Sequence, residues 1–303
     1  MSARSAIIET RIDAARTRAA EYLELTKPRV TAMVLVTTLA GYYLGAAGSF
    51  ESIVALNLLI GTALASGGTL ALNQYIERDT DAMMDRTRLR PIPDKRIEPA
   101  DAMWFGILAT AAGLGYLLLT VNWLCAAVIG AITISYLFAY TPLKRVSWSC
   151  NIVGAIPGAL PPVAGWAAAR GSLSLEPWVL FGIMFLWQLP HALAIAKIYR
   201  ADYKRARLWL IPLDRENSHP ENPVIFVSSI ILLIVGALPT LMGFAGIAYL
   251  VTSVALGCVL LVPAIVLVIG PESATAARRV MFASLFYLPT ILLVMVLDKV
   301  SSR

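Results

Sequence analysis

An acidic segment between two apolar stretches holds most of the side chains that could do chemistry. Residues 73–96 read NQYIERDTDAMMDRTRLRPIPDKR in a chain that is otherwise poor in charge. If the preceding helix continues through this segment, Asn73, Glu77, Asp81 and Asp85 follow one another at intervals of four residues and share one face. Asp79 would then lie on the opposite face. The spacing predicts a stripe of oxygen ligands at the end of a helix.

The residue types in the stripe suit a divalent metal ion and a phosphate group. Mg2+ is usually bound by one or two carboxylates together with the oxygens of a substrate phosphate. Arg86, Arg88 and Arg90 follow the stripe, and arginine can grip phosphate oxygens through two parallel hydrogen bonds. We therefore expect a magnesium diphosphate site. Its expected metal ligands are Asn73, Glu77, Asp81 and Asp85.

The alternative interpretation is an ordinary charged loop in which the acidic residues only neutralise the basic ones. A loop of that kind has no need of acids in register with Asn73, so the spacing argues against it. Further cations follow or precede other apolar stretches, where they are either interfacial anchors or partners that neutralise a leaving diphosphate. The expected diphosphate contacts are Lys27, Arg29, Lys144, Arg86, Arg88 and Arg90.

A second polar group ends another apolar stretch. Gln188 and His191 are three residues apart, and on a continuous helix Asp202 lies within about 20° of the face that carries His191. A neutral imidazole can accept a proton or bind a metal ion. The alternative is a histidine that is hydrogen-bonded between helices and only fixes their packing. His219 lies in a hydrophilic loop, where we expect it to be solvated.

The composition indicates a polytopic membrane protein. The chain has 303 residues, of which 58% are hydrophobic and 15% charged, and its mean hydropathy is +0.72. In soluble proteins about a quarter of residues are charged. The net charge of +6 does not indicate a nucleic-acid partner, because the basic residues cluster in short loops between apolar stretches. Cys125, Cys150 and Cys258 are isolated and read as small apolar residues.

The apolar stretches predict an all-α fold with about nine transmembrane helices, each close to the ~20 residues that cross a bilayer. The expected spans are 30–47, 53–74, 102–121, 122–140, 151–168, 177–196, 223–243, 247–269 and 280–297. We expect them to form one domain, 30–297. Residues 1–29 have the pattern of an amphipathic helix on the membrane surface, and 298–303 form a short external tail.

The distribution of basic residues predicts the orientation in the membrane. With these spans, 22 of the 25 Lys and Arg residues fall in the N-terminal segment or in alternate loops on the same side. Because such residues stay in the cytoplasm, the N-terminus is expected inside and the C-terminus outside. The fifth span holds Pro157, Pro161 and Pro162. Breaks of that kind survive at membrane depth only where protein or a cavity satisfies the backbone, so this span is expected to line the site.

The acidic segment resembles the first acidic motif of the intramembrane prenyltransferases of the UbiA type. Its form is NxxxExDxD, followed by MDRTRLRP at 84–91. The segments YLELTKPR (22–29), GALPPVAGW (158–166) and WQLPH (187–191) are similar to signatures of the branch that prenylates haem. In that branch a Pro-His pair, here Pro190 and His191, replaces the second aspartate motif. The resemblance covers 22–212.

This resemblance implies a UbiA-like helical bundle in the bacterial inner membrane. It implies transfer of the farnesyl group of farnesyl diphosphate to a vinyl group of haem b, with addition of water, giving haem O and diphosphate. Mg2+ is the implied cofactor, and a haem A synthase or oxidase assembly protein is a candidate partner. His191 would orient the porphyrin, ligate its iron or accept a proton. The implied catalytic residues are Asn73, Glu77, Asp81, Lys144 and His191, and the haem contacts are His191, Gln188 and Asp202.

Two other functions fit parts of the pattern. Another enzyme of this family would prenylate 4-hydroxybenzoate or a chlorophyll precursor, but Glu77 and the pair Pro190 and His191 argue against those acceptors. A transporter could use Asp and His as an ion relay. Relays place ionisable groups near the bilayer midplane, whereas the acidic residues here are expected at helix ends.

Overall fold

The computed structural model describes residues 18–46, 48, 50–212, 219–270 and 274–300. The regular secondary structure of the described residues is helical, apart from one isolated bridge between Ala245 and Lys299. The predicted all-α fold is therefore confirmed. Residues 18–25 are helical, but the rest of the expected amphipathic segment lies outside the described residues. The helices are α2 (Pro28–Gly45), α3 (Ser52–Asp81), α4 (Pro99–Thr120), α5 (Trp123–Ile134), α6 (Thr141–Leu143), α7 (Cys150–Ala159), α8 (Pro161–Arg170), α9 (Glu176–Ile198), α10 (Arg200–Arg205), α11 (Glu221–Val235), α12 (Leu238–Leu241), α13 (Ile247–Ile269) and α14 (Ala274–Leu297).

Eight helical segments of the described chain are long and apolar enough to cross a membrane, one fewer than the sequence predicted. The difference concerns α2, which coincides with the first expected span but contains Arg29 and several threonines. Two spans are composite. A π-helical turn, Ser135–Tyr140, joins α5 to α6, and α7 and α8 together form the expected broken span. The expected boundary between the third and fourth spans lies at Asn122, whose side chain caps α5 by accepting from the Cys125 amide.

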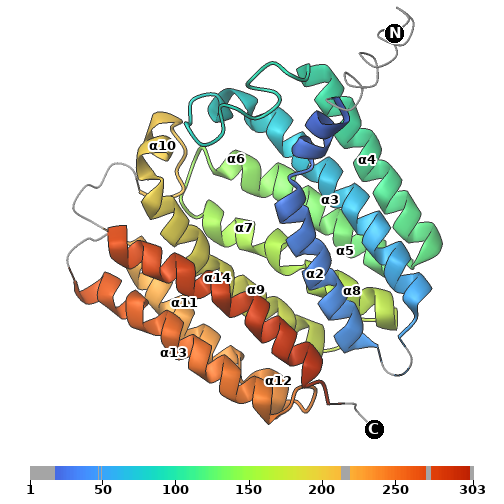
Figure 1. The fold of residues 1–303 in the computed structure, drawn as a ribbon, viewed down its shortest axis with the longest axis vertical. Coiled ribbons are helices and arrows are strands. Elements are labelled where there is room, and N and C mark those ends of the chain that lie inside the picture. The colour runs from blue at the N-terminus through green and yellow to red at the C-terminus, as the bar shows by residue number, and fades with distance from the viewer. Residues whose placement is uncertain (1–17, 47, 49, 213–218, 271–273, 301–303) are drawn as a thin grey trace, which may run out of the picture.

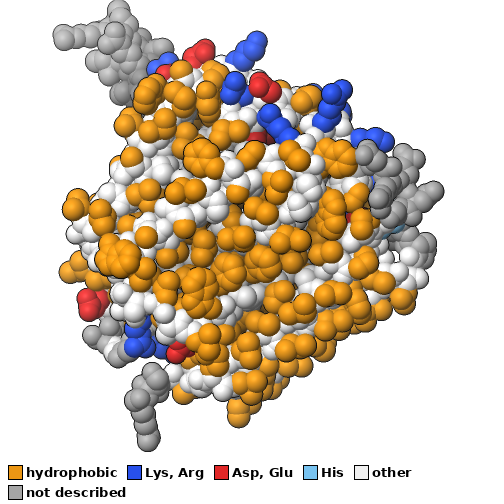
Figure 2. Space-filling view, turned by 180° about the vertical axis from the view of Figure 1, so that it is seen from behind, with side chains coloured by type: hydrophobic (Ala, Val, Ile, Leu, Met, Phe, Trp, Pro, Cys, Tyr) orange, Lys and Arg blue, Asp and Glu red, His pale blue; other side chains and the backbone are white. Residues whose placement is uncertain are grey.

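The helices form a central group with a further group on each side of it (Figure 1). Helices α3, α4 and α5 lie on one side, α11, α13 and α14 on the other, and α7, α8 and α9 lie between them. Figure 2 shows apolar side chains over most of the visible face and a concentration of charged side chains at one end. This distribution suits a bundle whose flank contacts lipid and whose charged end contacts water.

Glycines allow the helices of the first half to approach closely. A Cβ on Gly165 of α8 would lie 1.9 Å from the Thr38 carbonyl oxygen of α2, and a Cβ on Gly41 would lie 2.0 Å from the Pro162 carbonyl oxygen. Between α3 and α4, a Cβ on Gly113 would lie 2.4 Å from the Ala65 amide nitrogen. Small residues at such positions are how helices gain packing energy in lipid, where burial of apolar area provides little driving force.

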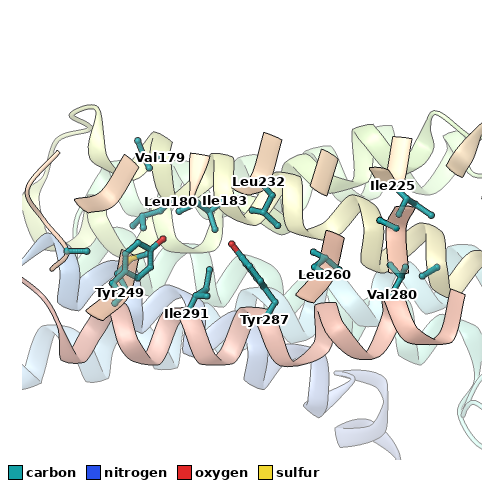
Figure 3. Close-up of a cluster of buried hydrophobic side chains, with 14 of the residues drawn as sticks. Val179, Leu180, Ile183, Ile225, Leu232, Tyr249, Leu260, Val280, Tyr287 and Ile291 are labelled. Carbon is teal, nitrogen blue, oxygen red and sulfur yellow. The ribbon is translucent and has the colours of Figure 1, made fainter. Parts of the chain in front are cut away.

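The second half packs around large apolar side chains. Figure 3 shows that side chains from α9, α11, α13 and α14 point toward one another in a common interior. Members of this cluster are fully or almost fully buried. They include Leu180, Ile183, Ile225, Leu232, Tyr249, Leu260, Val280, Tyr287 and Ile291. This half provides a rigid support against which α9 carries its polar residues.

We predict that Gly165→Ala destabilises the fold by about 1–3 kcal/mol, the usual cost of overpacking a tight interior. The added methyl group would force α2 and α8 apart, because its nearest neighbours are backbone atoms. Thermal unfolding in detergent measures the effect. Gly115→Ala is the matched control, since a Cβ there meets nothing within 4 Å. Equal melting temperatures for the two variants would contradict the predicted close contact.

Candidate active site

Helix α3 extends to Asp81 and places three polar side chains on one face. The predicted register is therefore confirmed for Asn73, Glu77 and Asp81, which are 0%, 8% and 1% exposed. Asp79 lies outside this face with 76% of its side chain exposed. A helix in a membrane protein buries carboxylates at its end only where they have partners, so their surroundings decide what they can do.

Asp85 does not join the stripe, and its predicted register is wrong. The helix ends at Asp81, and Thr87 Oγ1 then donates to the Asp81 backbone carbonyl at 2.9 Å, which turns the chain back over the helix end. The Asp85 side chain is 62% exposed. It accepts from Arg205 Nη2 at 2.8 Å and lies 3.8 Å from Arg88 Nε. Asp85 is part of a surface ion-pair network.

Each polar side chain of the stripe receives one cationic donor from a different part of the chain. The three donors come from the residue before α2, from the loop after α3 and from the end of α6. The pairs are Lys27 Nζ to Asn73 Oδ1 (2.9 Å), Arg90 Nη1 to Asp81 Oδ2 (2.6 Å) and Lys144 Nζ to Glu77 Oε1 (2.7 Å). Of the expected diphosphate contacts, Lys27, Arg90 and Lys144 therefore meet at one place.

Local structure holds these donors in position. Lys27 has left-handed backbone angles (φ 46°) and immediately precedes Pro28, the first residue of α2. Such a conformation is unfavourable for a residue with a side chain, so the surrounding contacts must maintain it. Gln74 Nε2 donates to the Leu25 carbonyl at 2.8 Å and ties this segment to α3. Asn73 Nδ2 donates to Thr141 Oγ1 at 3.1 Å and ties α3 to α6.

The two lysines have different protonation behaviour. Burial, together with the nearby positive charge of Arg90, lowers the pKa of Lys27 to about 7. Burial also disfavours the charge on Lys144, but Tyr140 and Glu77 outweigh that effect, so the pKa of Lys144 lies well above its usual value. Its Nζ also lies 4.3 Å from the centre of the Tyr140 ring. The pKa values of the two lysines therefore shift in opposite directions.

A mostly apolar cavity of about 270 Å³ lies beside the stripe. Ser66, Thr69 and Leu70, one to two turns before Asn73, form one wall. Thr69 Oγ1 and Thr133 Oγ1 are 2.9 Å apart across helices. The broken span lines the cavity, as expected, through residues of α7 and the first residue of α8. These residues are Asn151, Gly154, Ala155, Pro157, Gly158 and Pro161.

The other expected diphosphate contacts lie further out. Arg29 lines a second cavity of about 280 Å³ that Lys27 and Arg90 also reach. The Arg86 guanidinium lies 5.5 Å from the centre of the Tyr199 ring. Arg88 is exposed and near Asp85. Among the expected arginines, Arg90 is the one that contacts the stripe, and Arg29 lines the same cavity as Arg90.

His191 faces α14 instead of the apolar cavity. Its Nδ1 is 2.9 Å from Ser284 Oγ, and its ring stacks on Trp187 with centres 5.0 Å apart. Trp187 Nε1 in turn donates to the Ser284 carbonyl at 2.6 Å. Gln188 lines the cavity and donates to the Met184 carbonyl at 3.0 Å. Ser284 lies beyond the segments that carry motifs, and the only signal for it is a polar residue within an apolar span.

Two further expectations fail. Asp202 does not share a helix face with His191, because α9 ends at Ile198 and Asp202 belongs to the separate helix α10. There it pairs with Arg205. His219 is not simply solvated: its side chain is 17% exposed and its Nδ1 lies 3.3 Å from Glu221 Oε1.

The donor set of the stripe fits Mg2+. Among the described residues no three carboxylate, histidine or cysteine side chains converge, so a metal site built from those groups alone is excluded there. Two carboxylates and an amide oxygen one helical turn apart are nevertheless the usual protein contribution to Mg2+ when a substrate phosphate completes the coordination. In the described part of the chain, Glu77 Oε2 and Asp81 Oδ1 accept no hydrogen bond.

Comparisons with known proteins agree with this architecture. Residues 34–286 match the model of the UbiA prenyltransferase family. The chain is similar to the protoheme IX farnesyltransferase of Solibacter usitatus, with 42% identity over 289 residues that cover 92% of this chain and 98% of the relative. It is also 39% identical to the protoheme IX farnesyltransferase of Koribacter versatilis over 92% and 93% of the two chains.

Solved structures share the fold. A digeranylgeranylglyceryl phosphate synthase superposes with a TM-score of 0.79 at 14% identity, over 93% of this chain and 98% of its own. A UbiA homologue from Archaeoglobus fulgidus, bound to GPP and Mg2+, gives 0.66 at 16% identity over 91% and 99%. The helical bundle, the buried donor stripe and the family match lead to one conclusion. The chain belongs to the UbiA prenyltransferase family.

Proposed function

We propose that this chain transfers the farnesyl group of farnesyl diphosphate to a vinyl group of haem b, with addition of water, and releases haem O and diphosphate. The observation that carries the proposal is the donor stripe and its three cations beside an apolar cavity. The choice of haem rests on relatives named protoheme IX farnesyltransferase that match over more than nine-tenths of this chain.

The cations serve the departure of the diphosphate. Breaking the allylic C–O bond separates an allylic cation from a diphosphate anion, so groups that stabilise the anion lower the barrier. Lys27, Lys144 and Arg90 are the donors that meet at the stripe and would serve this purpose. Bound Mg2+ would add Lewis-acid stabilisation of the leaving oxygens, with Asn73, Glu77 and Asp81 as its protein ligands.

These three cations donate hydrogen bonds to the same side chains that are proposed as metal ligands. A diphosphate carries more negative charge than one carboxylate, so it competes for the ammonium and guanidinium groups. We propose that Lys27, Lys144 and Arg90 shift toward the diphosphate and leave the stripe oxygens available to Mg2+. The two ligands would then bind cooperatively, because each removes the partner that holds back the other.

The cavity supports the second half of the reaction. An allylic cation survives only where water is absent until the acceptor has attacked. The walls from α3, α5, α7 and α9 are largely apolar and suit a prenyl chain. On α14, the Ser284 hydroxyl donates to the Met281 carbonyl at 2.8 Å and so accepts from Nδ1–H of His191 on α9. His191 Nε2 keeps its lone pair, which suits binding to haem iron, accepting a proton or orienting the porphyrin.

The chain is an integral membrane protein by its spans and family. We propose the bacterial inner membrane, with the stripe facing the cytoplasm, since most Lys and Arg residues lie toward that end. We further propose a single domain at 30–297, a surface segment at 1–29 and an external tail at 298–303. A haem A synthase or an oxidase assembly protein would receive the product.

The proposed metal ligands predict that Asp81→Asn lowers turnover by about 10²–10³, the usual cost of losing one group that stabilises developing charge. Prenyl transfer by the purified enzyme with excess Mg2+ measures this. Asp79→Asn is the matched control, because it removes the same charge from an exposed position two residues away. Wild-type turnover of Asp81→Asn, with the control also active, would contradict the role of the stripe.

The proposed exchange of partners predicts opposite effects for Lys144→Met. Mg2+ alone should bind more tightly, because Glu77 loses its competing cation, whereas a non-hydrolysable farnesyl diphosphate analogue should bind at least about tenfold more weakly. Calorimetry with each ligand separates the two effects. Arg145→Met, which removes a neighbouring exposed cation, should change neither. If Lys144→Met binds Mg2+ with wild-type affinity, the proposed exchange of partners is wrong.

The proposed acceptor predicts a change in cellular haem. Expression in a host that lacks this activity should convert part of its haem b into a species heavier by one farnesyl group and one hydroxyl group, detectable by chromatography and mass spectrometry. The Asp81→Asn variant should not do so. If the purified enzyme instead prenylates a hydroxybenzoate and leaves haem b unchanged, the acceptor assignment is wrong while the family assignment stands.

A further inference from the structure

Another cavity, separate from the two cavities near the stripe, lies at the opposite end of the bundle. It has a volume of about 310 Å³ and lies where α2, α8 and α14 end. Its polar lining includes Trp166, Arg170, Glu176 and Lys299, and its apolar lining includes Phe50 and Leu297. No motif in the sequence pointed to it, and the proposed reaction does not use it.

Two cationic side chains line this cavity, although Lys and Arg residues are scarce at this end of the bundle. By the expected topology only Arg170, Lys299 and Arg303 among the 25 Lys and Arg residues lie on this side. Two of them line the same cavity. A small group of charged side chains is visible at this end in Figure 2, separated from the charged end by the apolar flank. Chance placement of cations on the depleted side would not bring two of them together.

Part of their role is structural. Lys299 Nζ donates to the Tyr43 and Ala46 carbonyls at 2.6 and 2.7 Å, and Arg170 Nε donates to the Gly45 carbonyl. These carbonyls end α2 and have no partner within the helix, so the cations cap it. This role uses two of the three ammonium hydrogens and one of the five guanidinium hydrogens.

The remaining donors lack acceptors within the described residues. One ammonium hydrogen and the four terminal guanidinium hydrogens donate to no oxygen there, although the ammonium lies 4.8 Å from the centre of the Tyr43 ring and the guanidinium 5.8 Å from that of Trp166. The Trp166 indole N–H also has no acceptor there, although Trp166 is only 3% exposed. Conversely, Glu176 Oε2 is a buried acceptor in this cavity that receives no hydrogen bond. Arg170 is exposed and Lys299 is half-buried, so water reaches their free hydrogens. The buried Trp166 N–H and Glu176 Oε2 are costly without partners, so they indicate a ligand that both accepts and donates hydrogen bonds.

We propose that this cavity binds the headgroup of an anionic phospholipid of the phosphatidylglycerol type. Arg170, Lys299 and Trp166 would donate to the phosphodiester, and a headgroup hydroxyl would donate to Glu176. The charges agree, because two cations and one carboxylate leave a net charge of +1, which one phosphodiester neutralises. The apolar wall around Phe50 and Leu297 suits the start of the acyl chains. This inference is independent of the reaction at the opposite end.

Native mass spectrometry of the full chain in detergent, combined with thermal unfolding, tests the proposal. Phosphatidylglycerol should remain bound and raise the melting temperature in proportion to the logarithm of its concentration, as expected for a ligand of the folded state. Phosphatidylcholine should give a clearly smaller shift. Equal shifts for the two lipids would overturn the charge-based recognition. An equal shift with inorganic phosphate or glycerophosphoglycerol would show a soluble-anion site and overturn the lipid assignment.

Variants locate the site. Arg170→Gln should weaken phosphatidylglycerol binding about tenfold, as for loss of one charged partner. Arg278→Gln removes an exposed cation at the other end of α14 and should leave binding unchanged. Because Arg170 also caps α2, Trp166→Phe provides a second variant that keeps the cap and removes the free N–H together with part of the buried ring. If both cavity variants retain wild-type lipid affinity, the proposed site is wrong.

Discussion

Compensation of buried negative charge at the end of α3 is the constraint on which the site depends. Glu77 and Asp81 are almost fully buried, and a buried carboxylate left without a partner costs about 3–5 kcal/mol. The chain meets this requirement with cations from three separate elements, so the segments before α2, after α3 and after α6 all converge on one helix end. The same pairs that allow the chain to fold also assemble the groups that a diphosphate needs.

This arrangement links stability and function in an unusual way. Under the proposed exchange, the cations would leave the stripe, stabilise the leaving group and expose the metal ligands. The site would then respond to Mg2+ and diphosphate together. The backbone of Lys27 has the left-handed conformation, which is unfavourable for a residue with a side chain. Such a conformation persists only where surrounding contacts hold it, so the contacts at this helix end also fix the position of Lys27.

Packing around the site follows a second constraint, the shortage of driving force for helix association in lipid. Glycines in α2, α3, α4 and α8 let backbones meet closely in the first half. The break at Leu160 and the π-helical turn before α6 interrupt two spans beside the cavity, where irregular backbone is tolerated. The second half packs instead through large side chains (Figure 3) and keeps α9 in place.

Local patterns were enough to determine the helical class, nearly all the spans, the break at the prolines and the register of Asn73, Glu77 and Asp81. Each of these depends on hydropathy or on the 3.6-residue helical repeat, which act within a short stretch of chain. Asp85 and Asp202 were misplaced because α3 ends at Asp81 and α9 at Ile198, and the helical repeat does not show where a helix ends. At the end of α3, the Thr87 hydroxyl turns the chain back by donating to the Asp81 carbonyl. The pairing of each cation with its acceptor, the link between His191 and Ser284, and the cavity at the far end were decided only by the tertiary structure. Each depends on side chains from separate elements, most of them far apart in the sequence, which the helical repeat does not relate.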